Sequence, residues 1–472
     1  MLLPMSPADS MFLLGESREH PMHVGGLALF APPEGAGARD VRAMLDAALT
    51  RADVAPLLRK RARRSLASLG QWGWETDKDI DLGHHVRHDA LPAPGGLAEL
   101  LELVSRLHAG LLDRGRPLWE MHLIEGLADG RFAVYMKIHH ALVDGVSAMK
   151  LLRSALSEDS DLREMPAPWE PLVRERPSLT LVTDAPDDGT VEGSRGGPLD
   201  LPGAAVRAVR GAVGLLPALA TTVDRAWHER GGSLSLAAPK SILNVQIGGA
   251  RRFAARSWPI ERLRLVAKAD DATINDVVLA MCSGALRNYM DDLDALPVDP
   301  LIAMVPVSLR RAVEEGQEGK AGNDFGVLSC NLATHLDDPA QRLAMVRTTM
   351  SEGKEAMSAR TPGEILAMSA LGAVPLVLGV LLGERAPIRP PNVMISNVPG
   401  PRTPLYWNGA RLSALYPLSI PVDGQALNIT CTSTDDEIAF GLTGCRRSVP
   451  PLQPLLGHLD DELAALERAV GL

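Results

Sequence analysis

The sequence predicts a mixed α/β protein that folds as two domains. The 472 residues are long enough for two packed domains with a substantial buried core. Strand-like alternation and helix-like periodicity also mix along the chain from end to end. With 46% hydrophobic and 22% charged residues, the composition is that of a folded globular protein.

The first part of the chain is expected to contain both element types. A strand is predicted over residues 24–30, and helices over residues 41–49 and 98–112. Residues 119–127 and 131–138 have the pattern of a β-hairpin, because Asp129-Gly130 between them is a common turn pair. A helix is expected to begin near Gly145, after which apolar residues recur at helical spacing.

A linker is predicted where the composition changes, between residues 157 and 202. Pro, Gly, Asp and Glu dominate there, and apolar periodicity fades. We therefore expect an N-terminal domain over residues 1–156, a flexible linker over 157–202 and a C-terminal domain over 203–472.

The second part of the chain continues the mixed pattern. Residues 203–227 are predicted to form an apolar helix with three arginines, which is either packed in the protein or bound to a membrane surface. Thr273 is expected to cap a helix that runs to about residue 290. Strands are predicted over residues 301–307, 326–334, 392–397, 412–418, 426–433 and 437–442, and an amphipathic helix over residues 452–470.

Charge and cysteine content argue against several classes of protein. The net charge is −10 and no run of Lys or Arg stands out, so nucleic acid is not an expected partner. The four cysteines are scattered without a CxxC pair, which favours neither a disulfide framework nor a metal site and fits a cytoplasmic protein. The N-terminus has no basic region followed by an apolar core, so no secretory signal is expected.

One apolar segment bears on membrane association. Residues 365–383 are uncharged, nearly the length of a bilayer span, but Gly372, Pro375 and Gly379 interrupt them. A buried helix pair, an element lying in a membrane surface and a true span are the three alternatives. The interruptions favour the buried helix pair.

The strongest chemical signal is the motif His139-His140-Ala141-Leu142-Val143-Asp144-Gly145. It stands where a predicted strand gives way to a predicted helix, a position from which side chains project into a cleft. Continued alternation places His140 on the apolar face of the strand and His139 on the opposite face. Asp144 is suited to orient the ring or hold the loop, and Gly145 permits close backbone approach.

A histidine in this position suits acyl transfer. An alcohol that attacks a thioester must lose a proton, and a neutral imidazole with a pKa near 6.5 accepts it near neutral pH and returns it to the departing thiolate. Burial keeps such a ring neutral. We therefore expect His140 to be a general base.

A second histidine pair serves as a comparison. His84-His85 is followed by an aspartate at the same offset, but Ala90 replaces the glycine, and the residues before the pair are charged instead of alternating. A surface or hydrogen-bonded structural role is expected for His84 and His85.

The motif resembles the HHxxxDG signature of the CoA-dependent acyltransferase superfamily. Further segments are similar to the bacterial wax ester synthase / diacylglycerol acyltransferase family. They are Ser6-Pro7-Ala8-Asp9 with Glu16, residues 21–25, residues 85–88 with 91–96, Pro117-Leu118-Trp119, residues 273–277 and residues 396–401. Together they span nearly the whole chain outside the predicted linker.

The resemblance implies a fold like that of chloramphenicol acetyltransferase, with mixed sheets and a tunnel between two domains. It implies that His140 is the general base and that Asp144 is structural, paired with an arginine of the other domain. Arg310 is the candidate partner. A buried pair of this kind fixes geometry more than it adds stability.

Several other residues are candidates for binding substrate or shaping the site, each with a plainer alternative. Trp119 lines an acyl channel or is a core tryptophan, and Glu16 is a site residue or a surface carboxylate. Asn275 and Asp276 shape the site or cap a helix. Ser396, Asn397 and Gly400 form a turn beside the pocket or serve tight backbone geometry.

The expected reaction is transfer of a long-chain acyl group from acyl-CoA to diacylglycerol, which forms triacylglycerol. A wax ester synthase acting on fatty alcohols, an acyltransferase for another alcohol and a non-catalytic lipid-droplet protein are the alternatives. No phosphate-binding loop, dinucleotide fingerprint or nucleophile elbow is present, so acyl-CoA is expected only as a co-substrate, without a cofactor or metal. Peripheral contact with the inner membrane or lipid droplets is expected.

Overall fold

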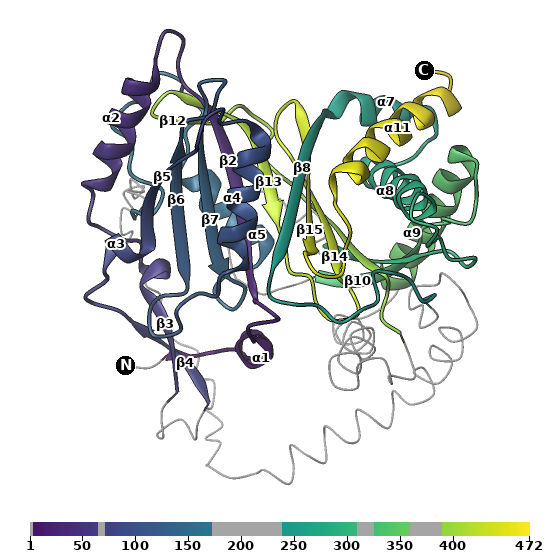
Figure 1. The fold of residues 1–472 in the computed structure, drawn as a ribbon, viewed down its shortest axis with the longest axis horizontal. Helices are drawn as coiled ribbons and strands as arrows, with labels where there is room; N and C mark the ends of the chain where they lie inside the picture. Colours follow the sequence, from purple (N-terminus) through teal and green to yellow (C-terminus); the bar gives the residue numbers. More distant parts are fainter. Residues whose placement is uncertain (1–2, 65–70, 172–237, 309–324, 359–388) are drawn as a thin grey trace, which may run out of the picture.

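The computed structural model describes residues 3–64, 71–171, 238–308, 325–358 and 389–472. These residues form two halves that lie side by side, each built on a six-stranded sheet (Figure 1). The N-terminal half is on the left of the figure and the C-terminal half is on the right.

The sheet of the N-terminal half contains the predicted hairpin. Its strand order is β12-β13-β2-β7-β6-β5. All neighbours pair antiparallel except β5 and β6, which are parallel. The strands are β2 (His23–Ala31), β5 (Val86–Ala90), β6 (Trp119–Glu125), β7 (Phe132–His139), β12 (Tyr406–Trp407) and β13 (Ala410–Leu418).

The two faces of this sheet are both buried. Alternate residues of β2 and β7 lie on opposite faces of the sheet, because successive side chains of a strand point to opposite sides. One face packs under α2 (Ala38–Leu49), through Val41, Leu45 and Ala48. The other face packs against α4 (Leu97–Ala109) and the C-terminal sheet. The strand that leads to the histidine motif is therefore held from both sides.

The C-terminal half is a sheet covered by helices on one face. The strand order is β10-β9-β11-β14-β15-β8. The strands are β8 (Arg251–Pro259), β9 (Ile302–Ser308), β10 (Phe325–Asn331), β11 (Val393–Val398), β14 (Leu427–Ser433) and β15 (Glu437–Cys445). The helices of its core are α7 (Ile260–Ala269), α8 (Ile274–Asp291), α9 (Pro339–Ser358) and α11 (Gln453–Ala469).

Smaller elements lie near the end of β7. They include α1 (Pro7–Gly15), a 3₁₀ turn (Pro56–Arg59), α3 (Leu82–His85) and α5 (Gly145–Ser154). A three-stranded sheet is formed by β1 (Leu3–Pro4), β4 (Trp72–Thr76) and β3 (Lys60–Arg64). Leu13 of α1, Trp74 of β4 and Ala141 of the motif share one small apolar cluster. This cluster anchors α1 beside the histidine pair.

The two halves are interlocked by a strand that crosses over. Strand β13 lies late in the sequence but pairs with β2 of the N-terminal sheet, from Arg411 opposite Ala31 to Leu418 opposite Gly25. The later part of the sequence thus contributes a strand to the N-terminal sheet, which is held there by backbone hydrogen bonds. The expected boundaries at residues 156 and 203 stay a prediction, because most of the linker lies outside the described residues.

Most predicted elements are confirmed where the structure describes them. The hairpin, the strand at residues 24–30, the helix capped by Thr273 and the six later strands all form, with ends shifted by a few residues. The strand β8 and the helices α1, α7 and α9 were not predicted. The arginines of β8 interrupt the apolar alternation that predicts a strand, although Arg251 is only 2% exposed.

Two predicted apolar elements, residues 203–227 and 365–383, lie outside the described residues. Among the helices of the described ranges, none combines the length and the apolar character that crossing a bilayer requires.

Candidate active site

The histidine pair stands at the end of the central strand β7. The strand ends at His139, His140 lies in the turn that follows, and α5 begins at Gly145. Asp144 is the N-cap residue of α5, and its Oδ1 accepts a hydrogen bond from the Ser147 amide at 2.6 Å. The short turn therefore projects from a rigid strand and is closed by a helix cap.

His139 is fully buried and has a defined tautomer. Its Nδ1 accepts a hydrogen bond from the Ala141 amide at 3.1 Å, so this nitrogen carries a lone pair and the proton resides on Nε2. Nε2 lies 3.4 Å from Oε1 of Glu16. His139 is thus held in place by the Ala141 amide and by Glu16.

Glu16 is an internal carboxylate, so the surface alternative is wrong. Its side chain is 1% exposed, and Oε2 lies 2.9 Å from Nε of Arg114. Oε1 also accepts from the Met22 amide at 3.3 Å. Burial alone would raise the pKa of Glu16, but hydrogen bonds from His139, Arg114 and Met22 lower it to about 2. Glu16 is therefore a stable anion behind the histidine pair.

His140 has the properties of a neutral base. Its ring stacks on Phe12 of α1, with ring centres 4.2 Å apart and planes 15° apart. Its backbone N–H donates to the Met22 carbonyl at 2.9 Å. Burial lowers the pKa of His140 below 6.5, while its own backbone and Asp144 act in the opposite direction. The residue as a whole is half-buried, and its Nδ1 is buried.

The C-terminal half reaches this turn through β11. A Cβ added to Gly145 would lie 3.6 Å from Cγ2 of Val398, which is ordinary contact. Ser396 and Asn397 precede Val398 on the same strand and are half-buried. Ser396, two residues before Val398, lies on the same face of β11 as Val398, whereas Asn397 lies on the opposite face.

Gly400 follows the same strand and fills a backbone role. A Cβ at this position would lie 1.7 Å from the Ser433 carbonyl oxygen. No side chain can occupy that place without moving β14. The alternative that Gly400 serves tight backbone geometry therefore accounts for this residue.

Trp119 is a core residue in this structure. It is fully buried, its Nε1 donates to the Leu58 carbonyl at 2.7 Å, and its ring stacks on His85. A role in lining an acyl channel stays a prediction, without a described cavity beside the ring.

Asn275 and Asp276 belong to the start of α8. Asp276 is 3% exposed and accepts hydrogen bonds from the amide and hydroxyl of Thr273, which completes a capping box. None of the contacts of Asp276 in the described ranges reaches the histidine turn. The capping alternative accounts for Asp276, and Asn275 beside it is half-buried.

The second histidine pair is structural, as expected. His85 is 1% exposed and hydrogen-bonds the Trp119 carbonyl through Nδ1 at 2.8 Å. Burial lowers the pKa of His85. His84 is half-buried and packs edge-on against the His85 ring.

Arg310 lies outside the described residues, so its pairing with Asp144 stays a prediction.

Sequence reasoning missed Phe12, Met22 and Arg114. Each acts on a histidine of the pair or on Glu16, from a segment distant in sequence. One local pattern could have indicated Phe12: it lies one helical turn before Glu16, just ahead of strand β2, which pairs with β7.

Strand β7 is further fixed by a buried cation. Lys137 is 2% exposed, lies 3.1 Å from Glu120 and donates to the carbonyls of Leu107 and Gly110 at the end of α4. Burial would raise the pKa of Glu120, but hydrogen bonds from His122 and Lys137 lower it to about 2. The charge pair locks the strand to α4.

Two surface pockets of about 580 and 590 Å³ lie elsewhere. The first is lined by Pro32, Met44, Phe132 and Met165, at the opposite end of β7 and roughly 23 Å from His139 along the strand. The second is lined by polar residues of β3, β4 and residues 113–116. His140 lines neither of them, so we do not assign these pockets to the reaction.

The chemistry available at the turn is proton transfer. The neutral imidazole of His140, whose pKa is lowered, lies where both halves meet. The Glu16 carboxylate lies beside the neighbouring His139. Within the described ranges, no three His, Cys, Asp or Glu side chains are grouped to hold a metal ion.

The class of fold is clear from solved structures. The first condensation domain of the CDA synthetase matches over 100% of this chain and 96% of its own, with 17% identity and a TM-score of 0.55. This likeness concerns the fold alone. The expected two-domain fold is confirmed.

Closer comparisons show the family. The catalytic-domain model of wax ester synthase/diacylglycerol acyltransferase matches residues 5–278, and the C-terminal domain model matches residues 321–467. The chain belongs to this family, and it is an acyltransferase.

Individual relatives match over almost their whole length. A putative diacylglycerol O-acyltransferase of Mycobacterium bovis is 53% identical over 468 residues, with 99% of this chain and 91% of the relative covered. A probable diacylglycerol O-acyltransferase of Mycobacterium tuberculosis is 49% identical over 471 residues, with 99% of each covered. The solved wax ester synthase/diacylglycerol acyltransferase of Marinobacter aquaeolei VT8 is 41% identical, with 100% of both chains covered and a TM-score of 0.79.

Proposed function

We propose that this enzyme transfers a long-chain acyl group from acyl-CoA to the free hydroxyl of diacylglycerol, with His140 as general base. The observation that carries the proposal is the state of the His140 ring. The ring stacks on Phe12, and burial lowers its pKa below 6.5, so the ring is neutral and basic at pH 7.

In the proposed reaction the acceptor hydroxyl gives its proton to Nε2 of His140 as it attacks the thioester carbonyl. The carbon–sulfur bond then breaks, and the imidazolium returns the proton to the CoA thiolate. The Nδ1 atom of His140 is buried, so Nε2 is the nitrogen left for the substrate. No acyl-enzyme is formed, and acyl-CoA is a co-substrate.

The remaining predicted residues receive supporting roles. We assign His139 the task of fixing the turn through Glu16, and Asp144 that of capping α5 and pairing with Arg310. Ser396 and Asn397 are proposed to shape the acceptor side, because β11 ends against Gly145. Gly145 is proposed to leave room for the reacting groups.

The names of the relatives support diacylglycerol as acceptor. Two mycobacterial relatives are named as diacylglycerol O-acyltransferases. The Marinobacter structure is also named a wax ester synthase, which makes long-chain alcohols the second candidate.

A labelled-substrate assay tests the proposal. The wild-type protein is incubated with labelled palmitoyl-CoA and either diolein or hexadecanol, and the lipid products are separated. We expect labelled triacylglycerol, and its loss in His140→Ala. The matched control is His84→Ala, which alters the second histidine pair and is expected to retain activity. Full product formation by His140→Ala would point to another base or to a non-catalytic lipid-binding protein.

We also propose that the protein acts in the cytoplasm at the surface of the inner membrane or of lipid droplets, because its proposed acceptor resides there. Flotation with liposomes that contain diolein tests this placement. Recovery of all protein in the dense fraction would contradict it.

A further inference from the structure

The segment between α1 and β2 is in contact with the catalytic turn. The Met22 carbonyl accepts the hydrogen bond of the His140 amide at 2.9 Å, and the Met22 amide donates to Glu16 at 3.3 Å. At the other end of the segment, α1 carries Phe12, whose ring stacks on His140. Any displacement of residues 16–22 therefore moves the backbone or the ring contact of His140.

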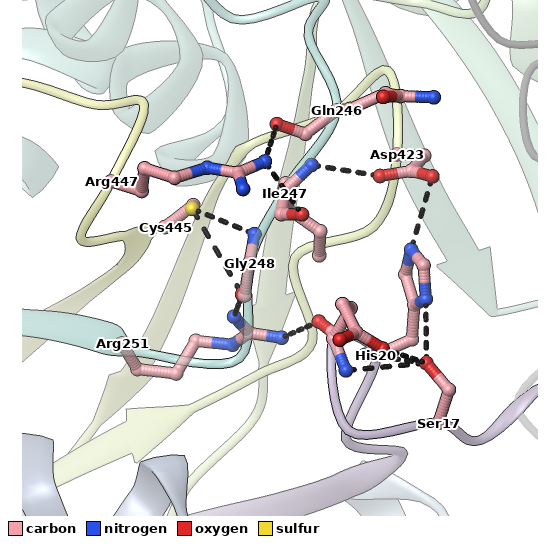
Figure 2. Close-up of polar contacts among 10 residues, drawn as sticks. Ser17, His20, Gln246, Ile247, Gly248, Arg251, Asp423, Cys445 and Arg447 are labelled. Atoms are coloured by element: carbon pink, nitrogen blue, oxygen red, sulfur yellow. Dashed lines mark hydrogen bonds and ion pairs between the residues drawn. The ribbon is translucent and has the colours of Figure 1, made fainter.

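The same segment is held by the C-terminal half through a contact between a histidine and a carboxylate. Nε2 of His20 lies 3.1 Å from Oδ2 of Asp423, with side chains 18% and 10% exposed (Figure 2). Nδ1 of His20 lies 3.0 Å from the Ser17 hydroxyl. His20 thus joins a turn of the N-terminal half to Asp423, which lies between β13 and β14.

Asp423 is itself fixed. Its Oδ1 accepts from the Ile247 amide at 2.8 Å, and the Ile247 carbonyl accepts from Arg447 at 3.1 Å (Figure 2). Burial would raise the pKa of Asp423, but hydrogen bonds from His20 and Ile247 lower it, so the carboxylate is ionised at neutral pH. The acceptor for His20 is a rigid anion.

A second contact holds the segment one residue earlier. Arg251 is 2% exposed and donates to the Glu19 carbonyl at 3.0 Å. The backbone of Gly249 lies so close that an added Cβ would be 2.3 Å from the Arg18 carbonyl oxygen. Two independent contacts from the C-terminal half thus define the path of residues 18–20. We call this set, Ser17, Glu19 and His20 with Arg251 and Asp423, the interdomain clasp.

We propose that Asp423 and Arg251 are positioning residues for His140: through the interdomain clasp the C-terminal half sets the place of the general base in the N-terminal half. The inference rests on the proposed role of His140. Its physical basis is that misplacement of a reacting group by about 1 Å costs up to about 100-fold in rate. The clasp ends at His20, two residues before Met22. A displacement of His20 is therefore expected to reach the Met22 carbonyl that holds the His140 amide.

Substitutions at the contact between His20 and Asp423 test the inference. Asp423→Ala and His20→Ala are expected to lower kcat about 10-fold or more, with KM changed less than about 2-fold. His20→Gln retains a side-chain N–H directed at Asp423 and is expected to restore most of kcat. Arg446→Ala is the matched control, because Arg446 contacts Glu102 of the N-terminal half at 3.5 Å without touching the segment. It is expected to keep the wild-type kcat.

Amide hydrogen exchange supplies a readout that does not depend on catalysis. Loss of the clasp is expected to increase exchange at the His140 amide, while amides of β14 and β15 keep their protection. Unchanged kcat in both alanine variants, or lowered kcat with unchanged exchange at His140, would overturn the proposal. If His140→Ala remains active, the proposed function fails, yet the exchange result still decides whether the clasp positions this backbone.

Discussion

Nε2 of His139 lies 3.4 Å from Oε1 of Glu16, and both side chains are sealed from solvent, at 0% and 1% exposure. The first histidine of the pair is thereby committed to holding the turn. The second, His140, is half-buried as a residue, and burial lowers its pKa. Two neighbouring residues of one type thus have different tasks, because one faces an anion and the other faces an aromatic ring.

The Glu16 carboxylate should make stability depend on acid pH. Its pKa is about 2 in the folded protein against an ordinary value of 4.5, so its contribution is complete above 4.5 and is lost as the pH falls toward 2. The shift corresponds to roughly 3 kcal/mol. Urea unfolding between pH 7 and pH 3 measures the first part of this loss. Glu16→Gln should be less stable at pH 7 and should lose less stability on acidification. An equal acid loss in both proteins would contradict this assignment.

The Phe12 ring should set the pH dependence of the reaction. Because burial lowers the pKa of His140, the acid limb of the kcat profile is expected to have its midpoint below 6.5. Phe12→Leu exposes the imidazole to water, which should move that midpoint up toward 6.5. Met11→Ala on the same helix, where Met11 is 62% exposed, serves as the control and should leave the midpoint in place. A midpoint that does not move in Phe12→Leu would show that the ring does not control hydration of the base.

The two glycines predicted for the site should respond oppositely to alanine. Gly400→Ala forces a Cβ into the Ser433 carbonyl and is expected to cost about 1–3 kcal/mol or more in unfolding free energy. Gly145→Ala makes only ordinary contact with Val398 at the start of a helix, so it should fold with wild-type stability or slightly above. Thermal and urea unfolding distinguish them. Loss of activity in a stable Gly145→Ala would assign the space at this position to the substrate.

Asp144 should act first as a helix cap. Asp144→Ala removes the acceptor for the Ser147 amide and is expected to cost about 1 kcal/mol together with activity and folding yield. Asp144→Asn keeps a capping oxygen and should stay near the wild-type stability. If the asparagine variant proved as unstable as the alanine variant, the carboxylate charge, and so the predicted pair with Arg310, would outweigh the cap. An alanine variant that stayed fully stable and lost only activity would contradict a structural role altogether.

The sequence could identify much of the fold. The hairpin that ends in the motif was predicted because Asp129-Gly130 and strict alternation are local signals. The helix after Thr273 was predicted from its cap and apolar face. Strand β8 was missed because its arginines interrupt the apolar pattern, and one of them, Arg251, is buried by partners that only the folded chain supplies, among them the Glu19 carbonyl. Helix α1 was missed because its apolar cluster includes β4 and Ala141, which are remote in sequence.

The candidate site divides in the same way. The sequence alone determined which residue is proposed as the base, because a histidine pair, an aspartate and a glycine follow an alternating strand, and the shift to helical periodicity marks the turn. Tertiary structure decided how each of those residues is used. Phe12, Met22 and Glu16 surround the pair, β13 crosses between the sheets, and Asp423 holds His20 from the other half. Pairing and burial across long sequence separations depend on packing, and no local pattern encodes them.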